Sequence, residues 1–292
     1  MFFDEGRRVP KRPFPSSPGH HPQRGQALER AALALRMRHF AEAERLAAEI
    51  LKASRTDTAA VSILAQSLLA QDRGSEAIAP LEKAVRRGGD AGIETLLGAA
   101  LGGAGRREEA IEQLRRTAAR QPPFPPAYQE LAGQLAKAGR VDEAIAVIES
   151  GIASLPENID LQLDLTRLHL RGNARDKART ILLKAREAAP GRPEILTALA
   201  RVLLLDGEYT AAADIYRHAL ALRPDDAMTR ADLAACLLEM GERDAGEANL
   251  RLALRGQPQM LGRATYTLIN SSHGRFFFRQ SAVAKFLQDK PA

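Results

Sequence analysis

The sequence predicts an all-α protein built from about seven tandem copies of one helix–turn–helix unit. Three marker residues recur with one period along most of the 292-residue chain. Between the markers the apolar residues follow helical spacing, as in Val61, Leu64, Ala65 and Leu68. Only 4% of the residues are aromatic and none is Trp, so Ala and Leu must form the core. This composition favours helix over strand.

The first marker is a small residue, and it sets the period. Its positions are Ala43, Ala77, Ala110, Ala144, Ala178, Ala212 and Gly246, at intervals of 34, 33, 34, 34, 34 and 34 residues. We expect the backbones of two helices to approach closely at this position, because only Ala or Gly leaves room for them.

The second marker is a glycine five residues before the small residue, and the third is a proline twelve residues after it. Four units carry the glycine, which we expect to end a first helix in the left-handed conformation: Gly105, Gly139, Gly207 and Gly241. In the fifth unit Gly172 lies one residue early, which predicts a one-residue shift of that helix. Five units carry the proline, which cannot continue a second helix: Pro122, Pro156, Pro190, Pro224 and Pro258.

A helix pair of 34 residues with these markers resembles the tetratricopeptide repeat (TPR) family over about residues 24–258. The aromatic residue usual near the start of the first helix survives only as Tyr128, and Arg30 stands where a core leucine is expected. The resemblance implies a right-handed α-solenoid, whose units bury apolar faces against their neighbours. The predicted units are 25–57, 58–90, 91–124, 125–158, 159–192, 193–226 and 227–258.

The two ends of the chain lie outside the repeats. Residues 1–24 contain five prolines, and we interpret them as a disordered basic arm. Residues 259–292 are predicted to cap the last unit, with a helix over 261–270, a break at Gly274 and a short helix capped by Ser281. Val283, Phe286 and Leu287 would share one side of that helix. We expect the adjacent phenylalanines 276–278 to be buried in this cap; the alternative is a hook for a partner.

The resemblance implies that first helices line a concave groove that binds an extended peptide or a partner's helix. The candidate groove residues are Gln66, Gln129, Gly133, Lys137, Arg167, Thr197 and Arg201. In the fifth unit the shift leaves two sets open, Leu163, Arg167 and Leu170 or Gln162, Thr166 and His169. A second interpretation is that all of these residues belong to ordinary solvated helix faces.

The groove residues predict a partner with some acidic character. The Lys and Asn of the family's two-carboxylate clamp are replaced by pairs such as Ser62 and Gln66, so an adaptor for chaperone tails is not expected. Net charge is +6, but residues 1–24 carry +3 and residues 255–292 carry +5, so residues 25–254 carry −2. A basic stripe for nucleic acid along the repeats is therefore not expected.

No sequence pattern indicates an enzyme, a cofactor or a metal site. The stretch 98–106, GAALGGAGR, lacks the Lys-Ser/Thr of a phosphate loop, and no GxSxG or HExxH occurs. Cys236, the single cysteine, is predicted to be a small buried residue, His169 and His218 surface or groove residues, and His20 and His21 part of the arm. We expect a non-catalytic cytoplasmic scaffold for a protein partner. The alternative is an accessory or recognition module for a separate enzyme, such as a transferase acting on peptides or cell-envelope glycans.

Overall fold

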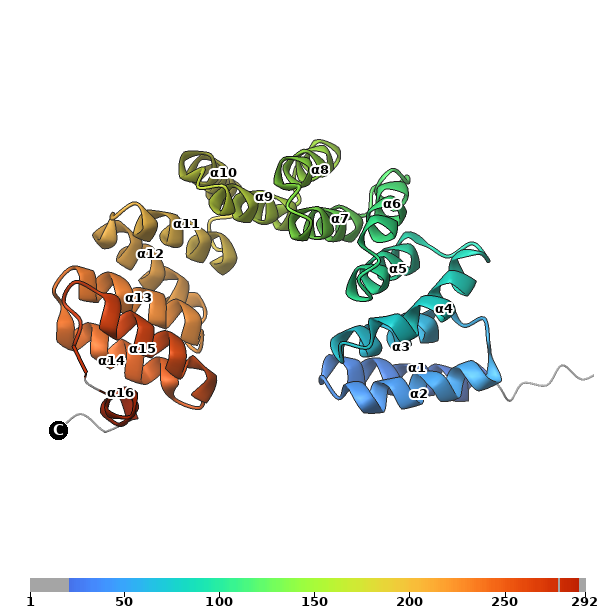
Figure 1. Cartoon of the computed structure of the whole chain (residues 1–292), viewed down its shortest axis with the longest axis horizontal. Coiled ribbons are helices and arrows are strands. Elements are labelled where there is room, and N and C mark those ends of the chain that lie inside the picture. The colour runs from blue at the N-terminus through green and yellow to red at the C-terminus, as the bar shows by residue number, and fades with distance from the viewer. Residues whose placement is uncertain (1–20, 278, 289–292) are drawn as a thin grey trace, which may run out of the picture. The chain divides into compact units, whose positions relative to one another are not determined.

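A computed structural model describes residues 21–277 and 279–288, and within them every regular element is a helix (Figure 1). The helices are α1 (His21–Arg36), α2 (Phe40–Ala53), α3 (Thr58–Ala70), α4 (Gly74–Val85), α5 (Ala91–Gly103), α6 (Arg107–Ala118), α7 (Pro125–Lys137), α8 (Val141–Ser154), α9 (Ile159–Arg171), α10 (Arg175–Ala188), α11 (Pro193–Leu205), α12 (Tyr209–Leu222), α13 (Ala227–Glu239), α14 (Arg243–Leu254), α15 (Leu261–Asn270) and α16 (Gln280–Gln288). A 3₁₀ turn, Pro258–Met260, precedes α15. The predicted all-α class is confirmed.

The chain forms two compact units, with the boundary between Gln134 and Leu135 inside α7. In the first unit α1 packs on α2, α3 on α4 and α5 on α6, and each pair also contacts the next. The second unit repeats this order from α9 to α14. Each helix pair therefore completes its core with the neighbouring pair, as expected of a stacked repeat.

The small repeat residues are all buried. All six alanines, Ala43, Ala77, Ala110, Ala144, Ala178 and Ala212, have no exposed surface. At the seventh position a Cβ on Gly246 would lie 2.7 Å from the Cγ atom of Leu238, which is closer than real Cβ contacts. The helices pack so closely here that a larger side chain would not fit unless its neighbours shifted.

The turns between paired helices use a left-handed residue in every unit. Gly105, Gly139, Gly207 and Gly241 have φ between 79° and 84°. Where glycine is missing, Arg38, Asp72 and Asn173 take the same position, with φ of 61°, 58° and 56°. Asn and Asp tolerate this region better than most residues.

The one-residue shift predicted for the fifth unit is wrong. Asn173, and not Gly172, takes the left-handed position, and it lies 34 residues after Gly139 and 34 before Gly207. Gly172 has an ordinary φ of −85° at the C-cap of α9. The set Leu163, Arg167 and Leu170 is therefore in register with the other units, while Thr166 and His169 of the alternative set are buried.

Side chains and prolines mark the helix ends. Asp57, Asp90, Asn158 and Asp226 each accept a hydrogen bond from a backbone N–H in the first turn of a first helix. Pro156, Pro190 and Pro224 each lie two residues beyond the end of a second helix. A proline at that place prevents the helix from continuing.

At the N-terminal side α1 begins at His21, so residues 21–24 of the predicted arm are helical, contrary to that prediction. Residues 1–20, including His20, lie outside the described residues. Arg30 is exposed, and the first unit builds its core instead from small residues of α1 such as Ala31 and Ala34.

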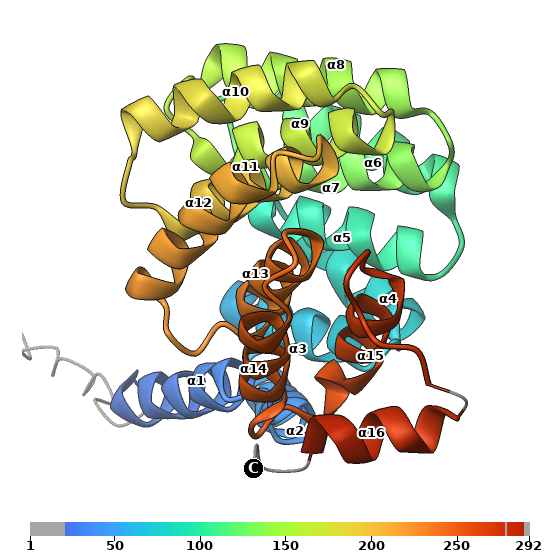
Figure 2. The same ribbon diagram turned by 90° about the vertical axis from the view of Figure 1, so that its left-hand side faces the viewer.

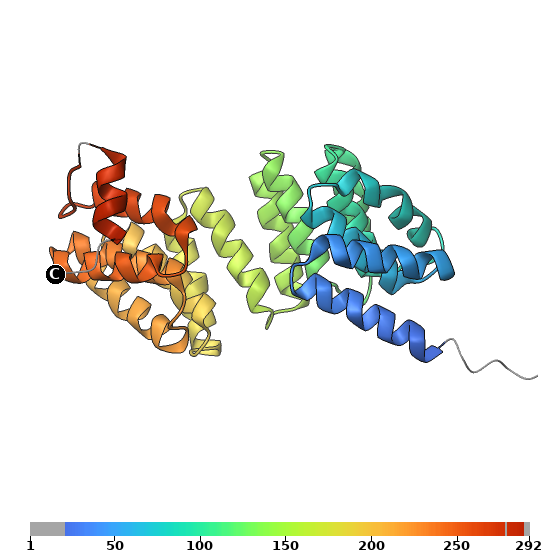
Figure 3. The same cartoon turned by 90° about the horizontal axis from the view of Figure 1, so that it is seen from below.

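The C-terminal helices pack on the last repeat. α15 contacts α13 and α14, and α16 contacts α14 (Figures 2 and 3). Val283 and Leu287 of α16 are buried in one core with Leu250 and Ala253 of α14. These contacts cover the apolar side of α14 that a further repeat would otherwise bury.

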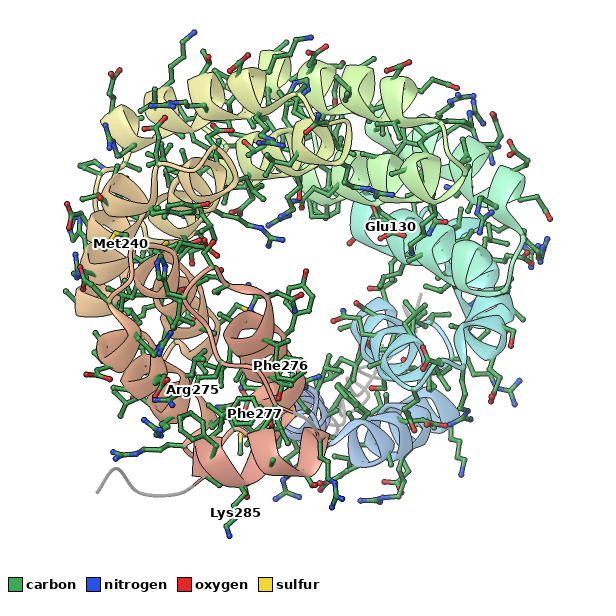
Figure 4. The ribbon with its side chains drawn as sticks, turned by 60° about the vertical axis from the view of Figure 1, so that its left-hand side comes forward. Glu130, Met240, Arg275, Phe276, Phe277 and Lys285 are labelled. Atoms are coloured by element: carbon green, nitrogen blue, oxygen red, sulfur yellow. The ribbon has the colours of Figure 1, made fainter. Side chains whose placement is uncertain are left out.

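Two details of the predicted cap are wrong. α16 begins at Gln280, so Ser281 lies inside its first turn and does not cap it. Phe276 is 78% exposed, whereas Phe277 packs on Phe286 with ring centroids 5.5 Å apart (Figure 4). Phe278 lies outside the described residues.

Gly274 is needed in the turn that precedes α16, because a Cβ there would lie 1.9 Å from the backbone oxygen of Leu268.

Candidate partner-binding groove

The second compact unit contains a cleft of about 620 Å³ along three first helices, α9, α11 and α13. Three of the predicted groove residues, Arg167, Thr197 and Arg201, line it together. Arg167 and Arg201 occupy equivalent positions of successive repeats, 34 residues apart. The cleft is therefore a direct product of the repeat register.

Four arginines line the cleft, and two of them form no salt bridge with the described residues, although the charge of Arg201 opposes the rise in the pKa of Asp232. Arg167 pairs with Asp164 and Arg223 with Glu194. Arg171 and Arg201 form no ion pair or hydrogen bond with any residue that the structure describes, and both are exposed. Both therefore remain available to an anionic ligand.

The three carboxylates of the cleft are already engaged. Glu194 pairs with Arg223 and lies 3.5 Å from Nε of Arg192. Asp226 caps α13 by accepting hydrogen bonds from the N–H groups of Met228 and Thr229 at 3.0 and 3.1 Å. The third, Asp232, pairs with Arg263. The charge left uncompensated in the cleft is positive.

Asp232 is a buried residue of the cleft and is held by side chains from two other helices. The Arg263 guanidinium comes from α15, and the Tyr216 hydroxyl of α12 donates to Oδ2 of Asp232 at 3.5 Å. Burial raises the pKa of Asp232, and the Arg263 guanidinium opposes this shift. Burial also raises the pKa of Tyr216, so its hydroxyl remains a donor.

Two large apolar side chains are exposed in the same cleft. Leu205, the last residue of α11, and Met228, in the first turn of α13, are each 48% exposed. Apolar surface beside unpaired arginines is typical of a site that buries an apolar side chain of a partner.

The other predicted groove residues lie elsewhere. Gln66 is exposed on α3 and donates a hydrogen bond to Ser62 at 2.9 Å. Gln129 and Gly133 are partly buried on α7, and Lys137 is exposed at the end of that helix. None of these four residues lines the cleft of the second unit.

Sequence reasoning missed Arg171, Leu205, Met228 and Asp232. Arg171 could have been found, since it lies four residues after Arg167 on the same helix face. Leu205 and Met228 lie at helix ends, where the repeat pattern does not specify which side chains face the groove. Asp232 could have been found because it is a charged residue in a mostly apolar helix.

Comparisons with known families account for the repeat. Models described as tetratricopeptide repeat match residues 28–92, 95–159, 135–202 and 203–261, which together cover most of the chain. The chain belongs to the tetratricopeptide repeat family. Its fold class is therefore that of TPR solenoids, and membership supports a general role in protein–protein interaction.

A curated protein is similar to part of this chain. Cellulose synthase operon protein C of Pseudomonas fluorescens (strain SBW25) is 38% identical over 92 residues, which are 32% of this chain and 7% of that protein. The chain thus corresponds to a small part of the length of that relative.

Solved structures of TPR proteins resemble this chain. The APC/C hetero-tetramer Cut9-Hcn1 contains a chain that is 17% identical and shares the fold, with a TM-score of 0.54 over 93% of this chain and 57% of that one. TTC0263, a thermophilic TPR protein of Thermus thermophilus, is 25% identical with a TM-score of 0.49, covering 61% of this chain and 96% of its own.

Two reactive side chains of the TPR array, Cys236 and His169, lie in its core. Cys236 has no exposed surface, and burial, followed by the charge of Asp232, raises its pKa to about 12. The prediction that His169 lies on the surface or in the groove is wrong, because its side chain is buried on α9. His218 is exposed on α12. Within residues 21–277 and 279–288 no three His, Cys, Asp or Glu side chains gather closely enough to hold a metal ion.

We searched the described helices for one able to cross a membrane, and none is both long and apolar enough. The helices are 9 to 16 residues long, whereas a spanning helix needs about 20 residues.

Proposed function

We propose that the protein is a non-catalytic scaffold, located in the cytoplasm, that binds a peptide or helix of a partner protein along its first helices. The observation that carries the proposal is the cleft of the second unit, where Arg171 and Arg201 lack ionic partners among the described residues and lie beside the exposed Leu205 and Met228. A partner segment with an apolar side chain next to a carboxylate fits this combination. The proposed function involves neither a cofactor nor a nucleic acid.

The wider groove extends the proposal beyond the cleft. Gln66, Gln129, Gly133 and Lys137 occupy first-helix positions equivalent or adjacent to those of Arg167 and Arg201. We infer that Gln66, Gln129 and Gly133 belong to a weaker partner-binding face of the first unit and Lys137 to one of the second, through the Gln amides, the Gly133 backbone and the Lys137 ammonium group at the rim. Rim contacts of this kind mainly change the association rate and its salt dependence.

The test begins by isolating the partner with the intact chain as bait and then measures its affinity for variants. Arg201→Glu combined with Lys137→Glu should weaken binding by about tenfold in low salt, because attraction becomes repulsion at two exposed positions. Lys184→Glu combined with Arg107→Glu is the matched control, since both residues are exposed and neither lines the cleft. Equal affinity of both double variants for the partner would refute the groove assignment.

A second candidate function follows from the curated relative. Its name places it in a cellulose synthase operon, and it is 38% identical to this chain over 92 residues. The chain would then act as an accessory or recognition module for a separately encoded enzyme that acts on glycans. Co-purification of a glycan-synthesising enzyme, with an activity that falls when the chain is removed, would favour this function over a scaffold without an enzyme partner.

A further inference from the structure

The first compact unit contains a separate cleft of about 650 Å³ that the proposed groove does not use. It lies between the end of α2, the start of α3 and the second half of α4, and the glycines 88 and 89 close one end. From α3 it takes Thr58 and Val61, whereas the predicted groove position Gln66 does not line it. The cleft thus lies on another side of the repeat from the groove residues.

All charged residues that line this cleft are cationic. Arg55, Lys83 and Arg87 line it, and no Asp or Glu does. All three side chains are exposed, and none forms an ion pair or hydrogen bond with the residues that the structure describes. Other arginines of the same unit are paired: Arg73 binds Glu44 and Glu76, and Arg106 binds Glu109.

The floor of the cleft is apolar. Leu51, Val61, Pro80 and Ala84 contribute to it, and Val61 and Ala84 are also part of the buried core. The exposed Ala79 leaves space above this floor. Apolar surface enclosed by unpaired cations resembles the anchor pocket of an interface more than an ordinary solvated helix face.

We propose that this cleft binds an acidic peptide segment of a partner protein that inserts one bulky apolar side chain. The three cations lie at separate places. Arg55 is in the turn after α2, and Lys83 and Arg87 lie four residues apart at the end of α4. Carboxylates spaced along a peptide can each reach one of them.

A compact phosphate group fits this cleft less well than spaced carboxylates. The N–H groups of Gly88 and Gly89 donate to the carbonyl oxygens of Val85 and Ala84, and the N–H of Ala60 donates to Asp57. These backbone donors are therefore not available to a phosphate.

The test uses the full-length protein and a fluorescein-labelled peptide of sequence DELFED, with NQLFQN as its neutral counterpart, followed by fluorescence anisotropy in low salt. The parent protein should bind DELFED and should bind NQLFQN about tenfold more weakly. Lys83→Glu combined with Arg87→Glu should weaken DELFED binding by about tenfold for the same reason. Ala79→Trp, which fills the cleft without changing charge, should weaken binding to a similar degree.

Two control variants test whether DELFED binds at this cleft. Arg107→Glu combined with Lys184→Glu changes net charge by the same amount at exposed sites outside the cleft and should leave DELFED binding unchanged. Arg201→Glu removes an exposed cation of the groove, where DELFED could bind as a second site, and the Lys83→Glu, Arg87→Glu pair should still weaken DELFED binding about tenfold when it is added to Arg201→Glu. The inference is overturned if the parent does not bind DELFED at millimolar peptide, if the control pair weakens binding as much as the cleft pair, or if only Arg201→Glu weakens it. Circular dichroism of each variant checks that it folds.

Discussion

Seven small residues set how closely the paired helices pack. Six are alanines without exposed surface, and the seventh is Gly246, where even a methyl group would meet Leu238. Dense cores respond to added volume by shifting side chains and backbone, which costs free energy of folding.

Ala144 gives the sharpest test of this packing. Ala144→Leu should lower the free energy of unfolding by about 1–3 kcal/mol, because Ala144 has no exposed surface and the larger side chain would overpack its surroundings. Ala146→Leu adds the same volume at an exposed position two residues away and should change stability by less than about 0.5 kcal/mol. Urea unfolding of both variants makes the comparison, and equal stabilities would show that the small residue is not required.

His169 is a buried titratable group of the second unit. Burial lowers its pKa, Lys177 lowers it further, and Glu149 partly opposes the shift. The unfolded chain, with an ordinary histidine pKa of about 6.5, therefore binds a proton more readily than the folded protein. Stability from this group is complete above that value and is lost as the pH falls from about 6.5 through the folded pKa.

Replacing His169 with Gln should remove this part of the pH dependence. The unfolding free energy of the parent should fall more steeply than that of His169→Gln when the pH is lowered from about 7 to about 5. His218→Gln, at an exposed position, is the control and should follow the parent. Parallel profiles for the parent and His169→Gln would mean that His169 does not contribute to acid sensitivity.

At the scale of elements, α16 is attached to α14 by a charged and aromatic cluster. Glu247, which is buried, pairs with Arg275 and lies 3.6 Å from a guanidinium nitrogen of Arg251. Both guanidinium groups lie over the Phe286 ring, with their central carbons 4.6 and 4.9 Å from its centroid. Cation–π contacts and a buried carboxylate with two cationic neighbours hold the segment in one orientation.

Neighbouring phenylalanines should differ in their effect on this attachment. Phe277→Ser should lower the free energy of unfolding by about 1–3 kcal/mol, since its ring packs on Phe286 in the apolar core of α14 and α16. Phe276→Ser should change it by less than about 0.5 kcal/mol, because that ring is exposed. Thermal unfolding measures both. A larger loss for Phe276 than for Phe277 would contradict the packing, and loss of a partner only for Phe276→Ser would identify that ring as a contact.

At the scale of the whole molecule, packing is local along the chain. In the part of the chain that the structure describes, helices in substantial contact are at most two elements apart, as in α3 with α5 or α11 with α13. Stability in such an array is a sum of contributions from each repeat and its interfaces with the next.

Locality predicts a confined response to mutation. Ala77→Leu should speed hydrogen exchange of backbone amides in α3, α4 and α5, which surround the added side chain, and leave α11, α12 and α13 unchanged. Ala212→Leu should give the reverse pattern. Hydrogen exchange with mass spectrometry can resolve these segments, and a uniform increase over both units would show that the chain unfolds as one cooperative body.

The repeat itself could be predicted from the sequence because its causes are local. Helical spacing, a left-handed turn residue and a small contact residue act within about one repeat, so their period specifies the helices and their register. In the fifth unit Gly172 suggested a one-residue shift of the first helix. Asn173 takes the left-handed turn position instead, so the interval between turn residues stays at 34.

Which charged side chains form ion pairs between helices was decided only by the tertiary structure. The sequence by itself predicted that Thr197 and Arg201 share one face but left Arg167 open between two sets, and the structure decided that Arg167 lines the same cleft and is paired, while Arg201 forms no salt bridge in the described part of the chain. It contains Phe276 and Phe277 side by side, but not which ring is buried. The pair of Arg167 with Asp164 is local to one helix, but others join side chains far apart in the sequence, as when Arg263 of α15 pairs with Asp232 of α13. An ion pair or a buried ring requires two helices at a set separation, and only the packed repeats supply that distance.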